Sequence, residues 1–239
     1  MKTRGKLTLV MLIIIIAAVA ASGAFTYLKS SSALEKQADV SALELAAAQR
    51  SVVSGILEKE EFLPFYMSQE KSILELLDDP QNEEKLEQVS LLIINLMVNK
   101  DNLDNIYVVD GNGVLLQNTV GSMNGSDLSN EPITSRVNEW WRPDISDIFI
   151  SKATGKKVIA FSYPIIDDQK YKLKGYISTH IYAESLIEQI NKVNEGNSKA
   201  TDSFIVDSSG KYIASSEEEN IGLTVEIKEI EQIAAKING

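Results

Sequence analysis

The chain has 239 residues, with 34 Asp and Glu against 23 Lys and Arg, one His and no Cys, and its net charge is −11. Without cysteine there is no disulfide framework, zinc knuckle or iron–sulfur cluster, and one histidine excludes a polyhistidine metal site within a single chain. The acidic balance argues against nucleic acid as a partner, because a surface that binds phosphates must be basic.

The N-terminal region predicts a membrane helix. Residues 7–28 carry no charge and are mostly Leu, Ile, Val and Ala. At about 1.5 Å per residue, this run is long enough for a bilayer core of about 30 Å. Lys2, Arg4 and Lys6 place the tail 1–6 in the cytoplasm, so we expect the bulk of the chain outside the cell membrane. The alternative is a secretory signal cleaved near Ala24.

Residues 30–104 predict an exterior helical region. Between Ala33 and Glu60 there is no Pro and one Gly, and apolar residues recur at Val40, Leu43, Ala47, Val53 and Leu57. This spacing predicts a long helix that leads out of the membrane. Further helices are predicted over 66–77, ending at Asp78-Asp-Pro80, and over 82–99.

Beyond Asn105 the pattern changes to short apolar runs between turns. The runs predict strands over 106–109, 114–116, 145–150, 158–166 and 173–181, and Asp110-Gly-Asn-Gly113 predicts a hairpin turn. Helices followed by about five antiparallel strands predict an α+β domain with a sheet built from local hairpins.

An internal repeat indicates a second domain. Residues 107–118, YVVDGNGVLLQN, align without a gap on residues 204–215, FIVDSSGKYIAS. Each copy predicts a strand, a tight turn and a strand. The second copy, 203–239, leaves room for two strands and a helix over 226–236. We therefore expect an incomplete second domain of a longer protein, with a cytoplasmic signalling module beyond Gly239.

This order of elements, with Ser151-Lys-Ala-Thr-Gly-Lys156 and a strand ending in Tyr163-Pro164, resembles the double Cache (PAS-like) sensor domains of bacterial chemotaxis receptors and sensor kinases. The resemblance covers nearly everything after the predicted membrane helix. It implies a PAS-like five-stranded sheet, a membrane-distal ligand-binding domain over 105–195 and the start of a second PAS-like domain. It also implies signalling across the membrane, and we expect a homodimer.

The amino-acid-binding subgroup of this family uses an Arg-x-Trp-Tyr element and an Asp at the end of the last strand. Here Glu131-Pro-Ile-Thr134 and His180 stand at those places. An Asp that would pair with an amine is therefore missing, and an ordinary L-amino acid is not the expected ligand.

Several residues are candidates for a ligand pocket. His180 with Arg142 or Arg136 would suit an anion or a carboxylate, because guanidinium groups bind oxyanions bidentately. Trp141 would form a wall, and the two-residue strand period would place Asp147 and Phe149 on one face. The remaining candidates are Tyr163, as a hydroxyl donor, and Tyr107. The alternative interpretation is a surface histidine beside ordinary core residues.

Catalysis is not expected, because the sequence has no Gly-x-Ser-x-Gly, phosphate loop, His-Glu-x-x-His or second histidine. No cofactor is expected either. The main hypothesis is the small-molecule sensing part of a transmembrane chemotaxis receptor. The alternatives are the sensor of a histidine kinase or diguanylate cyclase, a membrane-anchored protein-interaction module with a filled interior and an exposed apolar patch, and a secreted enzyme.

Overall fold

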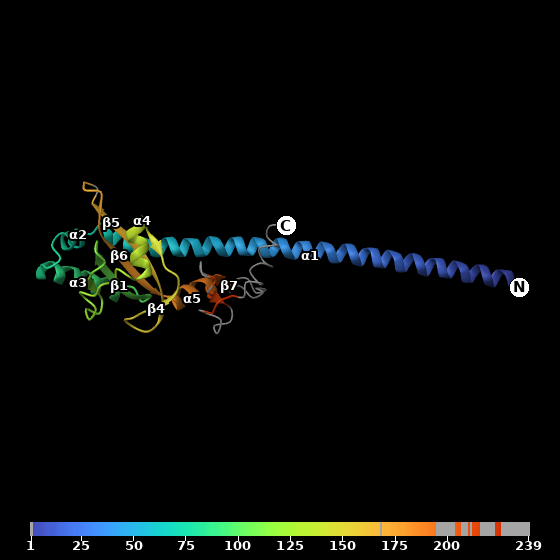
Figure 1. Ribbon diagram of the computed structural model, residues 1–239. Coiled ribbons are helices and arrows are strands. Elements are labelled where there is room, and N and C mark those ends of the chain that lie inside the picture. The colour runs from blue at the N-terminus through green and yellow to red at the C-terminus, as the bar shows by residue number, and fades with distance from the viewer. Residues whose placement is uncertain are drawn as a thin grey trace. The chain divides into compact units, whose positions relative to one another are not determined.

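The fold is taken from a computed structural model (Figure 1). It describes residues 2–167, 169–194, 204–206, 210, 212–215 and 223–225. The side chains of 2–10, 12, 14, 132–135, 187, 190–194, 204–205 and 213–215 lie outside this description. By backbone contacts the chain divides into the units Met1–Arg50 and Ser51–Gly239.

The unit Met1–Arg50 is the first part of helix α1 (Lys2–Ser68). Large apolar side chains such as Ile15, Val19 and Leu34 are exposed on it. A search of the described residues finds no helix with the length and apolar character needed to cross a membrane. The long helix predicted over 33–60 is confirmed, and the membrane span over 7–28 stays a prediction.

In the second unit, α1 is followed by α2 (Lys71–Asp78) and α3 (Glu83–Val98). The prediction of one helix over 66–77 is wrong, because α1 ends just before Gln69 and Glu70. The N–H groups of these two residues donate to carbonyls three residues earlier, at 3.1 Å each, and so terminate the helix. Glu70 is extended, with φ −68° and ψ 126°, and a new helix begins after it. The helix predicted over 82–99 is confirmed, and the Asn82 side chain caps it by accepting from the Lys85 N–H at 3.2 Å.

In the part of the chain that the structure describes, six strands form an antiparallel sheet in the order β2-β1-β6-β5-β3, with β4 also paired to β5. The strands are β1 (Leu103–Asp110), β2 (Leu115–Asn118), β3 (Asp144–Ile145), β4 (Phe149–Ile150), β5 (Lys157–Asp167) and β6 (Lys172–Tyr182). The predicted strands around 106–109, 114–116, 158–166 and 173–181 are confirmed. The prediction of one strand over 145–150 is wrong, because the structure divides it into β3 and β4.

A bulge causes this division. Ile145 pairs with Phe161 and Phe149 pairs with Val158, so residues 146–148 face only 159–160 on β5. The Ser146 N–H donates to the Ala160 carbonyl, and its Oγ accepts from the Ala160 N–H, both at 2.9 Å. The hydroxyl thus takes the place of a backbone carbonyl in the ladder. The extra residue shifts the alternation of side chains beyond it.

The sheet has a core on each face. On one face Ile106, Phe161 and Ile177 pack with side chains of α1, α2 and α3 such as Met67, Leu76 and Ile93. The opposite face carries a smaller cluster formed by Tyr107, Val109, Leu115, Leu128, Tyr176 and Val137, the last from α4 (Pro132–Trp140). Successive residues of β1 alternate between the two clusters, as a pleated strand requires.

The repeated hairpin is present in the structure. Strands β7 (Phe204–Val206) and β8 (Tyr212–Ser215) follow α5 (Ala183–Asn194). Phe204 pairs with Ser215 as Tyr107 pairs with Asn118, and the register shifts after the aligned residues Val108 and Ile205. The N–H of Tyr212 bonds to the Leu223 carbonyl at 2.9 Å, as Leu115 bonds to Ser126 at 2.9 Å. The predicted hairpin is confirmed. The helix predicted over 226–236 lies outside the described residues, and the second PAS-like domain stays a prediction.

Candidate functional site

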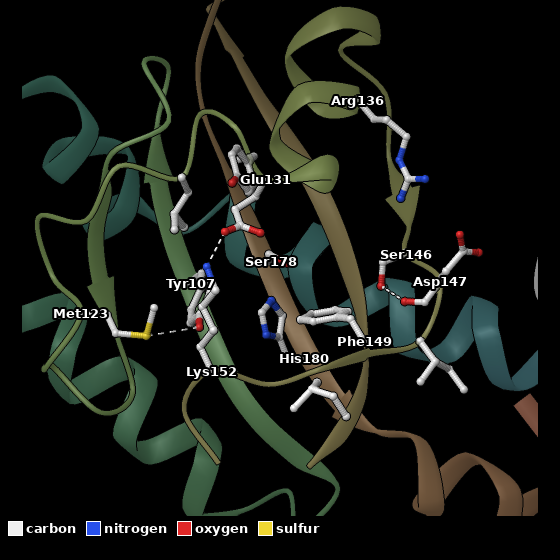
Figure 2. Close-up of a pocket in the computed structure, with 14 residues that line it drawn as sticks. Tyr107, Met123, Glu131, Arg136, Ser146, Asp147, Phe149, Lys152, Ser178 and His180 are labelled. Carbon is white, nitrogen blue, oxygen red and sulfur yellow. Dashed lines mark hydrogen bonds and ion pairs between the residues drawn. The ribbon is translucent and has the colours of Figure 1, made fainter. Parts of the chain in front are cut away.

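A cavity of about 390 Å³ lies on the face of the sheet that carries the smaller cluster. Its walls come from β1, β4, β6, α4 (Pro132–Trp140), the bulge before β4, the loop between β2 and α4, and the turn after β4 (Figure 2). Tyr176, Ser178 and His180 of β6 all line it, since alternate residues of a strand share a face.

His180 lies in the buried part of this pocket and is 4% exposed. Its ring is tilted against the Tyr107 ring, with centroids 4.4 Å apart, and it meets the Phe149 ring edge-on at 5.4 Å. Burial lowers the pKa of His180 to about 4, and the Asp104 carboxylate only partly opposes this effect. The imidazole is therefore neutral at pH 7.

The Nδ1 atom of His180 is buried and has no hydrogen-bond partner among the described residues. Buried polar atoms are nearly always hydrogen-bonded in folded proteins. His180 also lines the pocket, and a group in the cavity reaches this buried nitrogen only if the side chains around it move.

The pKa of the Tyr107 hydroxyl is also shifted by its surroundings in the pocket. Its hydroxyl contacts the Met123 sulfur at 3.8 Å. The pKa of Tyr107 is raised to about 12, mainly by burial and also by the carboxylates of Asp104 and Glu131. The phenol therefore stays protonated at pH 7.

The hydroxyl residues of the Ser151–Lys156 motif bind the side chain of Asp104. Its carboxylate is buried and accepts hydrogen bonds from Ser151 Oγ at 2.6 Å and from Thr154 Oγ1. The two hydroxyls fasten the turn between β4 and β5 to the start of β1. This turn carries Lys152 to the pocket.

Two ion pairs lie at the pocket wall. Lys152 Nζ pairs with Glu131, and Figure 2 shows this bond beside Tyr107. Arg136 Nε pairs with Asp144 at 2.8 Å. Both cations that the structure brings to the pocket thus have a carboxylate partner.

The structure brings together Tyr107, Arg136, Asp147, Phe149 and His180 of the predicted residues, all of which line the pocket. In Figure 2 the Asp147 carboxylate points away from His180, so the shared face predicted for Asp147 and Phe149 is not kept. The bulge at Ser146 is the reason, because it shifts the two-residue period.

Trp141, Arg142 and Tyr163 are not among the lining residues. Trp141 is predicted to line the pocket on the assumption that it lies in a strand. In the structure it follows the last residue of α4 in the left-handed conformation, with φ 48°, and is 39% exposed. Arg142 is exposed beside it. Tyr163 points to the helical face, where its ring packs on Phe65 of α1 at 5.1 Å.

Sequence reasoning missed the other lining residues, which are Met123, Leu128, Glu131, Ser146, Ile148, Ile150, Lys152, Tyr176 and Ser178. The strand period counted back from His180 could have found Ser178 and Tyr176. The loop residues Met123, Glu131 and Lys152 are brought in by tertiary folding and carry no periodic signal.

Residues 30–239 match the family model of the Cache domain. The chain belongs to the Cache domain family. The resemblance to double Cache sensor domains is thereby confirmed, and the α+β architecture with a long helix and an antiparallel sheet is that of a Cache fold. A comparison with curated protein sequences finds no match.

Solved structures support the same fold. The sensor domain of the Vibrio cholerae histidine kinase DctB is 14% identical, with a TM-score of 0.55, over 79% of this chain and 71% of that one. The ligand-binding domain of the Campylobacter jejuni chemoreceptor Tlp3 with L-valine is 16% identical, with a TM-score of 0.59, over 80% and 76%. The Pseudomonas aeruginosa chemoreceptor PctC with GABA is 17% identical, with a TM-score of 0.55, over 74% and 76%.

Proposed function

We propose that this Cache chain is the extracytoplasmic sensing part of a membrane-anchored receptor and that it binds a small molecule in the pocket around His180. The observation that carries the proposal is a cavity of about 390 Å³ walled by the buried His180 and the rings of Tyr107, Phe149 and Tyr176. Pockets of roughly 300–1,000 Å³ with few polar groups are typical of small-molecule sites. The role is binding and not catalysis.

The receptor is anchored by residues 7–28 and works as a homodimer. Ligand binding shifts the equilibrium between two states of α1, and the difference in ligand affinity between the states drives the shift. The output is chemotactic, as in the chemoreceptors Tlp3 and PctC. The kinase neighbour DctB favours a second candidate, the sensor of a histidine kinase.

The carboxylate ligand expected from the sequence meets an obstacle in this pocket. It would have to displace Asp144 from Arg136 or Glu131 from Lys152, since both cations are paired. The proposal of a small-molecule sensor therefore does not depend on an anionic ligand.

A thermal-shift screen of the full chain in detergent tests the proposal. Amino acids, organic acids, amines, purines and sugars are compared, and a ligand at 100 times its Kd should stabilise the fold by about 2.7 kcal/mol. We expect His180→Ala to remove the shift. Tyr163→Phe, on the helical face, is the matched control and should keep it.

A folded chain that responds to no class of molecule would contradict the proposal. It would favour a membrane-anchored protein-interaction module instead.

A further inference from the structure

Two carboxylates act on the aromatic groups of the pocket. The carboxylates of Asp104 and Glu131 both raise the pKa of Tyr107, and Asp104 acts in the same direction on His180. Figure 2 shows the Glu131 carboxylate, the Tyr107 ring and the His180 ring around the same part of the pocket. Glu131 is ion-paired with Lys152, whereas the buried Asp104 accepts from hydroxyls, so the charge of Asp104 favours a positive group in this part of the pocket.

The neutral groups in this region also suit a cation. His180 is uncharged at pH 7, so its ring does not repel a ligand cation. The rings of Tyr107 and Phe149 pack around it, and Tyr176 also lines the cavity. The faces of aromatic rings attract ammonium groups.

Lys152 already places an ammonium group at Glu131. Their side chains are 62% and 41% exposed. Ion pairs exposed to this degree contribute little to stability, because water screens them. Either partner of this pair can therefore be replaced with little loss of protein stability. The negative charge of the buried Asp104, which accepts from the Ser151 and Thr154 hydroxyls, favours a ligand cation at Glu131 over a ligand anion at Lys152.

We infer that the pocket takes an organic ammonium ligand without a carboxylate, whose charged nitrogen replaces Lys152 at Glu131 while its apolar part lies against Tyr107, Phe149 and Tyr176. This inference rests on the proposed function and names the ligand class of the same site. Replacement frees Lys152, which stands on the turn that Asp104 fastens to β1. Ligand binding thereby changes the link between the two loops that border the pocket.

Matched ligands test the ammonium class. The full chain in detergent is titrated calorimetrically at pH 7 with 2-phenylethylamine, 3-phenylpropionate and L-phenylalanine, which carry the amine, the carboxylate or both. A second set without an aromatic ring, hexylamine, hexanoate and L-norleucine, is titrated in the same way in case the pocket accepts only a narrower ligand. We expect an amine to bind most tightly, its amino acid more weakly, and the acid not at all.

Two substitutions test the exchange with Lys152. Glu131→Gln should weaken amine binding about tenfold, the value of one charge-assisted hydrogen bond. Lys152→Gln should tighten amine binding, because it removes the competing cation. Lys170→Gln, at the exposed turn after β5, is the matched control and should leave the affinity unchanged.

The outcomes separate this inference from the proposed function. Binding of an acid or an amino acid more tightly than its amine would overturn the ammonium class and leave the sensor intact. Weaker amine binding in Lys152→Gln would overturn the exchange. Binding of neither amine, in a chain that a purine or sugar stabilises, would overturn the inference alone, and no binding by any class would overturn both.

Discussion

His180 is buried without charge, and this links the stability of the domain to pH. Its pKa falls from an ordinary value of 6.5 to about 4 in the folded chain, because burial penalises the imidazolium. The unfolded chain therefore binds a proton at a higher pH than the folded chain. Above pH 6.5 the effect is absent, and between pH 6.5 and about pH 4 stability falls with falling pH.

His180→Gln should remove this component of the pH dependence. Urea unfolding is measured from pH 4 to pH 8 for both chains, and the difference between their unfolding free energies is followed. The wild type should lose up to about 1.4 kcal/mol more per pH unit in the acidic window, the value of one proton. The carboxylates titrate in both chains, so they cancel in the difference. Parallel curves would contradict a neutral, buried His180.

Some site residues could be predicted from the sequence and others could not. His180, Tyr107 and Phe149 lie on strands, and a strand offers a side chain only two faces to point to. Trp141 ends a helix instead, and its direction depends on how α4 is oriented over the sheet. Glu131 and Lys152 meet across 21 residues, and the alternating patterns in the sequence give no information about such pairs.

The hairpin of β1 and β2 shows how an element is fixed by its turn. Asp110 Oδ1 accepts from the N–H groups of Asn112 at 2.9 Å and Val114 at 2.8 Å. Gly113 takes φ +87°, and a Cβ built there would lie 2.8 Å from the Ser129 Cα. The turn therefore needs glycine both for its conformation and for a close contact. Gly210 takes φ +79° at the matching place in the second hairpin.

Gly113→Ala and Gly125→Ala together separate these two effects. Gly125 has a similar φ of +84°, but nothing lies within 4 Å of a Cβ built on it. Gly125→Ala should cost about 1 kcal/mol for the left-handed conformation alone. Gly113→Ala should cost clearly more, because Ser129 must also move. Equal decreases in the unfolding free energy, measured with urea, would show that the contact with Ser129 does not contribute to stability.

At the scale of elements, the sequence predicts the strongly patterned segments well. The helix over 82–99 has a capping Asn and an apolar face, and both strands of each hairpin flank a recognisable turn. The bulge at Ser146 was not predictable, because it depends on a side-chain hydroxyl that bonds to Ala160 on another strand. A one-residue insertion of this kind leaves no trace in composition.

Within the unit Ser51–Gly239, a buried polar cluster joins the helical layer to the sheet. The Glu60 carboxylate of α1 is 2% exposed, pairs with Lys100 and accepts from Asn102 Nδ2 at 3.1 Å. The Asn102 carbonyl in turn accepts from the Tyr182 N–H at 3.0 Å. The end of β6, two residues beyond His180, is thus connected to α1 by hydrogen bonds.

Lys100→Ala should destabilise the chain by about 3 kcal/mol, since it leaves Glu60 buried without its cation. Glu60→Gln should cost only about 1 kcal/mol, because the amide can still bond to Asn102 and Lys100 can reach water. The double variant should be no less stable than Lys100→Ala alone. Urea unfolding of the three variants gives the coupling energy, and strictly additive losses would refute this account.

The short strands at the borders of the sheet bear on how the chain avoids aggregation. In the described sheet the central strands β5 and β6 are 11 residues long, whereas β2 at one border has 4 residues and β3 and β4 at the other have 2 each. A long, regular border strand offers free N–H and carbonyl groups to other chains. The bulge at Ser146 interrupts that border. The residue that shapes the pocket wall therefore also hinders the stacking of one copy onto the next.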